Sequence, residues 1–233
     1  MKTGNRTLRM PGMIITIDGP AGTGKSTVSR AVAQRLGFDF LDTGAMYRAV
    51  ALEAIRRKAD LNDEAEVARI ARDCRIEFDW SCRPPEVILD GEPAGHLLRS
   101  EEVTAGASKV AVAPGVRARL VEEQRRIGAE RANLVSEGRD QGSMVFPDAR
   151  LKVYLDATPR ERARRRAMQL RERGEVADER VILEQILERD HRDSTRATGP
   201  LSVPKGAEVI DTTPLTEQEV IDRIVSRAKA LLG

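Results

Sequence analysis

One short stretch constrains this chain more than any other: Gly19-Pro-Ala-Gly-Thr-Gly-Lys25-Ser26. It follows the apolar residues 13–17 and precedes a segment with helical periodicity, so it fits the pattern G-x-x-x-x-G-K-[ST] between a strand and a helix. Glycines let such a loop turn its backbone N–H groups inward around phosphate oxygens, and a helix N-terminus favours anions. The residues expected to hold a nucleotide are Gly19, Pro20, Ala21, Gly22, Thr23, Gly24, Lys25, Ser26 and Thr27.

Two side chains of this loop predict the ligand in more detail. A lysine at the position of Lys25 can reach the β- and γ-phosphates of ATP, and a hydroxyl at Ser26 can ligate Mg²⁺. The alternative is a glycine-rich turn with a chance Lys-Ser pair. The agreement of strand, loop and helix favours the phosphate-binding interpretation, with ATP and Mg²⁺ as cofactors and Ser26 as the metal ligand.

The charge balance excludes several classes of partner. The 39 basic residues are matched by 37 acidic ones, which predicts a mixed solvated surface rather than one that binds nucleic acid. Aromatic residues make up only 3% of the chain, too few for a base-stacking platform and consistent with an aliphatic core. No apolar run approaches the length of a membrane span.

Cysteine usage and the first residues indicate the compartment. Cys74 and Cys82 show no C-x-x-C spacing, so we expect free thiols in a reducing environment. Residues 1–12 contain no apolar core of a secretory signal and are interpreted as a disordered tail. We therefore expect a cytoplasmic monomer without a membrane partner.

Strand and helix patterns alternate at both ends of the chain, which predicts an α/β fold. A parallel sheet covered by helices on both faces should place ligands at the carboxyl ends of its strands. The middle differs, because two alternating segments around a Pro84-Pro85 pair and an Asp90-Gly91 turn predict a small antiparallel sheet. Expected strands cover residues 13–18, 38–42, 76–80, 86–89, 133–136, 151–155 and 207–211. Expected helices cover residues 25–36, 45–57, 62–74 and 100–132, the last with a break at residues 114–115. Two charged helices are expected after Thr158, with a split near Gly174, and a final helix after Thr216. Residues 137–142 are expected to form a loop.

A phosphate-binding loop alone does not identify the acceptor. No Asn-Lys-x-Asp guanine-reading pattern occurs, and the chain is short for a motor protein. Arginines recur at loop and helix-end positions far from the loop, at Arg48, Arg139, Arg189, Arg192 and Arg196. A planar guanidinium binds phosphate in a bidentate way, so these arginines favour a kinase whose acceptor is itself phosphorylated.

Four segments together resemble the bacterial-type cytidylate kinases, a family of P-loop nucleoside monophosphate kinases. They are ITIDGPAGTGKST at residues 15–27, LDTGAMYRA at 41–49, EGRDQGSMVFP at 137–147 and RDHRDSTR at 189–196. They occur in the family's order and cover nearly all of residues 13–233. The resemblance implies a three-layer α/β P-loop NTPase fold, with a core of residues 13–58 and 114–233, an acceptor-binding antiparallel insertion at about 59–113 and a lid at about 160–196. It also implies ATP-dependent phosphorylation of CMP and dCMP.

The same resemblance assigns roles to individual residues. Lys25, Arg139, Asp140 and Arg189 would be catalytic. Thr43, Arg48, Arg139 and Arg189 would line the acceptor ribose and phosphate, Ser108, Arg117 and Arg196 the cytosine edge, and Asp193 the ribose hydroxyls. Arg162, Arg165 and Arg166 would form the base of the lid, with Arg165 contacting ATP.

Other interpretations of these residues stay open. Arg48 could cap its own helix, and Asp140 could serve only to form a turn. The acceptor could be uridylate, adenylate or a small metabolite, and the chain could instead be a nucleotide-binding regulator. Where the family often has Asp, this chain has Glu137, whose longer side chain would shift any water-mediated contact with Mg²⁺.

Overall fold

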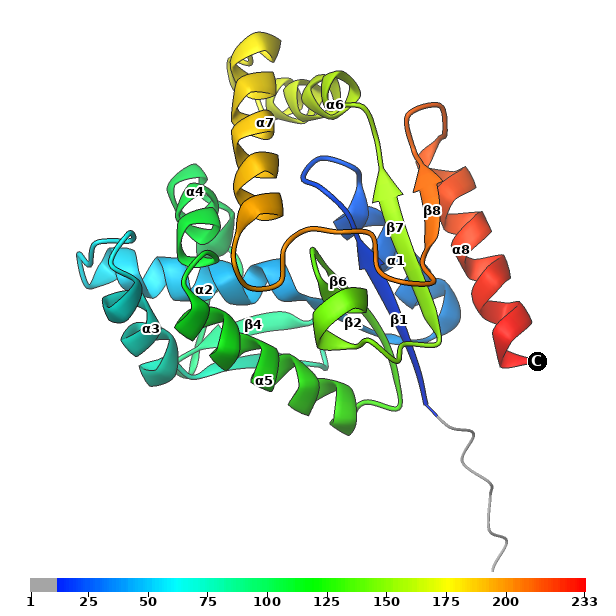
Figure 1. The fold of residues 1–233 in the computed structure, drawn as a ribbon, viewed down its shortest axis with the longest axis horizontal. Helices are drawn as coiled ribbons and strands as arrows, with labels where there is room; N and C mark the ends of the chain where they lie inside the picture. The colour runs from blue at the N-terminus through cyan, green and yellow to red at the C-terminus, as the bar shows by residue number, and fades with distance from the viewer. Residues whose placement is uncertain (1–11) are drawn as a thin grey trace, which may run out of the picture.

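The computed structural model describes residues 12–233 and centres on a five-stranded parallel sheet (Figure 1). The expected tail at residues 1–12 therefore lies, except for residue 12, outside the described residues. The strand order is β2-β6-β1-β7-β8, so the strand that leads into the glycine-rich loop is the central one. The strands are β1 (Met13–Asp18), β2 (Asp39–Asp42), β6 (Asn133–Gly138), β7 (Leu151–Asp156) and β8 (Glu208–Asp211).

Helices cover both faces of the sheet, as the alternation predicts. The side chains of Met13, Ile15 and Ile17 pack with α1 (Lys25–Leu36) and α8 (Glu217–Leu232) on one face. Adjacent residues of a strand point to opposite faces of the sheet, so Val135 packs on this same face while Leu134 packs with the helices of the opposite face. Those helices are α2 (Thr43–Arg56), α3 (Glu64–Asp73), α4 (Glu101–Val110) and α5 (Pro114–Glu130). The three-layer α/β architecture is confirmed.

A second sheet of three antiparallel strands lies beside this core. It consists of β3 (Ile76–Asp79), β4 (Glu86–Leu89) and β5 (Glu92–Pro93), and η1 (Leu97–Arg99) follows it. The guanidinium carbon of Arg131 lies 4.1 Å from the centroid of the Trp80 ring and links this sheet to the end of α5. The predicted small sheet is confirmed, and Cys74 and Cys82 are both free.

Two helices extend beyond the carboxyl ends of the strands (Figure 1). They are α6 (Pro159–Glu172) and α7 (Glu179–Thr195), and they share a small apolar cluster built on Ala163, Ala167, Ile182 and Ile186. Within residues 12–233, no helix is both long and apolar enough to span a bilayer.

The structure corrects two details of the expected elements. β6 continues through Glu137 and Gly138, which were expected in a loop, because both pair in register with β1. The helical break precedes residue 114, and Pro114 is instead the first residue of α5, where a missing N–H costs nothing. Gly115 lies inside α5, and a Cβ there would come within 2.6 Å of the Ala68 Cβ, so this glycine allows α3 and α5 to pack closely.

Candidate active site

The glycine-rich loop connects β1 to α1 and leaves the first turn of that helix without a side-chain cap. Gly24 is the N-cap residue with φ of 87°, a left-handed conformation that favours glycine. The uncapped N–H groups at this helix end are available to an anion. The Lys25 side chain is buried, and its Nζ donates to the Pro20 carbonyl at 2.5 Å. The loop therefore presents backbone donors and one buried ammonium at the end of the sheet.

A cavity of about 330 Å³ opens in front of this loop. It brings together most of the residues that the sequence singled out, from the loop, α2, α4, α5, the end of β6 and α7. Its lining includes Ala21, Gly22, Gly24, Lys25, Ser26, Thr27, Thr43, Arg48, Ser108, Arg117, Arg139, Asp140, Arg189, Asp193 and Arg196. Gly19, Pro20, Thr23 and Arg165 do not line it.

An ion-pair network forms the wall opposite the loop. Arg117 is fully buried and donates to the Asp140 carboxylate and, at 3.1 Å, to the Tyr47 hydroxyl. The Arg196 Nη2 lies 3.7 Å from the second Asp140 oxygen. Asp140 is thus the shared anion of two buried arginines rather than only a turn residue.

A second group of cations lies closer to the glycine-rich loop. Arg139 donates to Asp193 at 2.9 Å, and the Arg189 Nε lies 3.9 Å from the same carboxylate oxygen. Burial, and then the neighbouring Arg139, lowers the pKa of Arg189 to about 10. Burial and the same two arginines lower the pKa of Lys25. These cations repel one another in a partly desolvated site, so an anion among them would relieve the repulsion.

Glu137 lies at the end of β6, facing the loop. Its side chain is buried, and burial raises its pKa, with Asp42 adding to the effect and Lys25 opposing it. Ser26 lies near this carboxylate and, like Lys25, acts to lower its pKa. Thr43 donates to the Glu137 carbonyl oxygen at 2.6 Å, which fixes the start of α2 against β6.

The arginines of α6 divide into different roles. Arg162 is buried, donates to the Ala21 carbonyl at 3.1 Å and pairs with Asp190 at 2.7 Å, so it fastens α6 and α7 to the loop. Arg165 instead donates to Thr212 and to Glu161. The structure therefore does not bring Arg165 into the cavity.

Two contributors to the site, Tyr47 and Gly199, were missed by the sequence analysis. Tyr47 accepts from Arg117. Arg192, one of the recurring arginines that the sequence indicated, donates to the Ser108 hydroxyl at 2.7 Å. Gly199 has φ of +58°, and a Cβ there would clash with Arg117 and Asp140. Tyr47 lies inside the quoted segment at residues 41–49, so its position was a usable sign, whereas nothing local marks Gly199.

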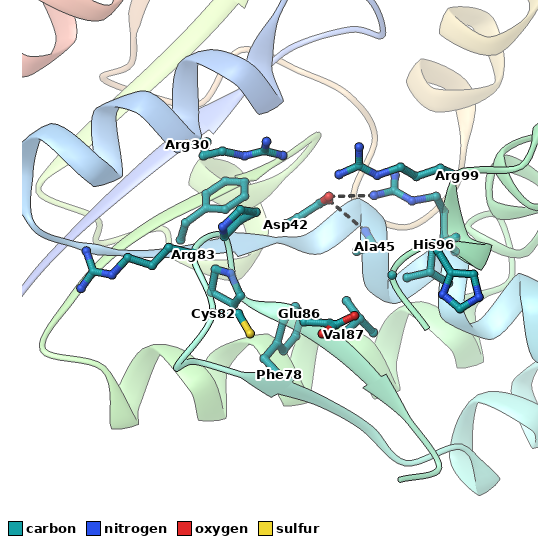
Figure 2. Close-up of a pocket in the computed structure, with 16 residues that line it drawn as sticks. Arg30, Asp42, Ala45, Phe78, Cys82, Arg83, Glu86, Val87, His96 and Arg99 are labelled. Carbon is teal, nitrogen blue, oxygen red and sulfur yellow. Dashed lines mark hydrogen bonds and ion pairs between the residues drawn. The ribbon is translucent and has the colours of Figure 1, made fainter. Parts of the chain in front are cut away.

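A second cavity of about 460 Å³ lies on the other side of Asp42 and Arg48, between β2 and the small sheet (Figure 2). Arg30, Arg83 and Arg99 contribute guanidinium groups to its walls. Asp42 accepts from Arg48 at 2.7 Å and from the Ala45 N–H at 2.9 Å, so it both caps α2 and holds Arg48 (Figure 2). The helix-capping alternative for Arg48 is therefore wrong, since Asp42 is the cap.

The first cavity meets the requirements of a site for phosphorylated ligands. Its lining contains six cationic side chains, at Lys25, Arg48, Arg117, Arg139, Arg189 and Arg196, against four acidic ones. Within the described part of the chain, the Nε atoms of Arg48, Arg117 and Arg189 and the Nη2 of Arg196 are buried without a hydrogen-bond partner. Buried donors normally have acceptors, so these atoms fit an anionic ligand.

Comparisons with known proteins agree with this chemistry. The family model for cytidylate kinase matches residues 15–230. A cytidylate kinase of Pelotomaculum thermopropionicum is 46% identical over 93% of this chain and 96% of its own length, and one of Caldanaerobacter subterraneus is 46% identical over 90% and 92%. A crystal structure of an uncharacterized protein from Eubacterium ventriosum shares the fold, with a TM-score of 0.51 at 11% identity over 93% of this chain and 98% of that one. The chain belongs to the cytidylate kinase family.

Proposed function

We propose that this protein transfers the γ-phosphoryl group of ATP to CMP, and to dCMP, in pyrimidine nucleotide metabolism. The observation that carries the proposal is the buried, positively charged cavity in which the glycine-rich loop faces arginine donors without partners. One ligand, the donor nucleotide, binds at the loop. The other, a nucleoside monophosphate, binds against the arginines.

The chain's own residues supply charge and position. Lys25 and the loop N–H groups stabilise the negative charge that develops on the transferred group. Arg48, Arg139 and Arg189 bind the acceptor phosphate, and their mutual repulsion is relieved when it arrives. Asp193 is held by Arg139 at 2.9 Å and would face the acceptor ribose, as would Thr43.

Mg²⁺ fits the residues present at the loop. Magnesium is commonly held by one or two protein groups together with substrate phosphates. Ser26 would bind it directly, and the neighbouring Glu137 would contact it through water. When bound, the ion neutralises charge on the phosphate oxygens. In residues 12–233 no group of three or more His, Cys, Asp or Glu side chains could hold a metal alone.

Base selection rests on Ser108, Arg117 and Arg196. Arginine can only donate, so it suits the N3 acceptor of cytosine and disfavours the N3–H of uracil. Arg117 is oriented by Asp140 and Tyr47, while its Nε is without a partner. Uracil in this site would leave buried polar groups unpaired, which can give strong discrimination between CMP and UMP.

The remaining parts of the chain complete the proposed site. Residues 59–113 form the acceptor-binding insertion on a core of residues 13–58 and 114–233, and residues 160–196 form a lid. Closure of α6 and α7 would exclude water and protect ATP from hydrolysis. Arg165 and Arg166 would then approach ATP only in that closed state.

A coupled assay of ADP formation with CMP, dCMP, UMP, AMP and GMP tests the proposal. We expect the highest kcat/KM with CMP and dCMP. Arg139→Ala and Arg189→Ala should each raise the KM for CMP more than the KM for ATP. A preference for UMP or AMP would transfer the assignment to another acceptor kinase. Tight ATP binding without turnover on any monophosphate would indicate a nucleotide-binding regulator instead.

A further inference from the structure

Asp18 is the last residue of β1, directly before the glycine-rich loop, and its side chain is completely buried. Its two carboxylate oxygens accept from two successive backbone N–H groups, Gln141 at 2.8 Å and Gly142 at 2.7 Å. The proposed binding and catalytic roles do not include this carboxylate. An ionisable side chain in such a place is costly unless it is hydrogen-bonded, so its two acceptors have a definite task.

The two N–H groups belong to the start of η2 (Gln141–Val145), a π-helical turn that follows β6. The turn closes on the Asp140 carbonyl, which accepts from the N–H groups of Met144 and Val145. A Cβ on Gly142 would lie 2.7 Å from the Thr16 Oγ1, so the turn sits directly against β1. Irregular turns of this kind often occur at functional sites.

Along the chain, the turn directly follows two residues of the proposed acceptor site. Arg139 and Asp140 immediately precede Gln141, and their side chains pair with Asp193 and Arg117. Asp18 therefore connects the strand that carries the donor loop with the segment that carries two residues of the acceptor wall.

We propose that Asp18 is a positioning residue, which fixes the backbone of residues 139–142 so that Arg139 and Asp140 face the acceptor. The proposal rests on the proposed function and names a residue that acts on acceptor binding without touching the acceptor. A carboxylate suits this task because two parallel N–H donors need two acceptor oxygens. An asparagine of the same shape would turn an NH₂ donor toward one of these N–H groups.

The chain offers a matched control on the same strand. Thr16 lies two residues earlier, on the same face of β1, is fully buried and approaches the same turn, but its Oγ1 has no hydrogen-bond partner among the described residues. Thr16→Val changes one buried polar group to an apolar one of similar shape. Like Asp18→Asn it keeps the shape of a buried side chain beside the turn, but it removes no anchor of the turn.

The test compares Asp18→Asn with Thr16→Val and the wild-type enzyme. We expect Asp18→Asn to raise the KM for CMP roughly tenfold, which corresponds to about 1.4 kcal/mol at 25 °C. The KM for ATP should stay within about twofold of the wild-type value, because the turn that Asp18 anchors carries residues of the acceptor site. Hydrogen exchange at residues 139–145 should accelerate in Asp18→Asn but not in Thr16→Val.

Unchanged KM values in an Asp18→Asn enzyme of lowered thermal stability would reduce Asp18 to a structural role and overturn the proposal. An equal rise in both KM values, or the same CMP effect in Thr16→Val, would overturn it as well. Failure of the wild-type protein to phosphorylate any monophosphate is a different result, because it contradicts the proposed function rather than the anchor at Asp18.

Discussion

Arg117→Met tests whether the wall of the acceptor site is held together by its own charges. The Arg117 side chain is 0% exposed and the Asp140 side chain 5%, and the two are hydrogen-bonded. Removing one partner of a buried ion pair typically costs about 3–5 kcal/mol, because it leaves the other charge without compensation. We expect the loss of stability in Arg117→Met to lie toward the lower end of this range, since Arg196 still lies 3.7 Å from Asp140.

The reciprocal change should be at least as damaging. Asp140→Asn leaves Arg117 and Arg196 facing each other, and Arg117 already lowers the pKa of Arg196 after the larger effect of burial. The double variant Arg117→Met/Asp140→Asn removes that repulsion. It should therefore be more stable than Asp140→Asn alone, by an amount on the order of 1–3 kcal/mol of coupling.

Urea denaturation of the wild type, both single variants and the double variant measures this coupling. Activity is read in parallel, and we expect the CMP:UMP ratio of kcat/KM to fall toward one in both variants that lack Arg117, even where stability recovers. Additive losses of stability, with the double variant the least stable, would refute the reasoning. A preserved CMP:UMP ratio would show that Arg117 supports the fold only.

Three further predictions follow from the same contacts. Lys25→Met should lower kcat by a factor of about 100 or more with little change in the unfolding transition, because one preorganised charge at a phosphoryl transition state is lost; near-normal turnover would contradict the donor-site assignment. Gly199→Ala should destabilise the protein and raise the KM for CMP, since the new methyl group would clash with Arg117 and Asp140; calorimetry and kinetics check both effects. Burial raises the pKa of Asp18 from 3.8 to about 6, so the contribution of Asp18 to stability falls as pH rises from about 4 to 6. The kcat/KM for CMP should instead fall below about pH 6, because the protonated carboxyl group has one acceptor oxygen fewer for the two N–H groups. An Asp18→Asn enzyme with the wild-type acid profile would contradict the second half of that prediction.

The sequence by itself determined the fold class and most residues of the cavity. The glycine-rich loop, the helix starts at Thr158 and Thr216 and the alternation in β1 are local, since each depends on backbone preference or side-chain period within a few residues. The four segments that resemble the family supplied Thr43, Arg48, Arg139 and Arg189, all of which line one cavity.

Tertiary structure alone decided how these residues are paired. With 39 basic and 37 acidic side chains, the sequence permits many ion pairs, and only the packing selects Arg117 with Asp140. The same holds for Asp18, whose partners lie 123 and 124 residues away, and for Gly199, whose lack of a side chain leaves room for that pair. Such contacts arise between segments that meet only when the sheet has formed, so no local pattern encodes them.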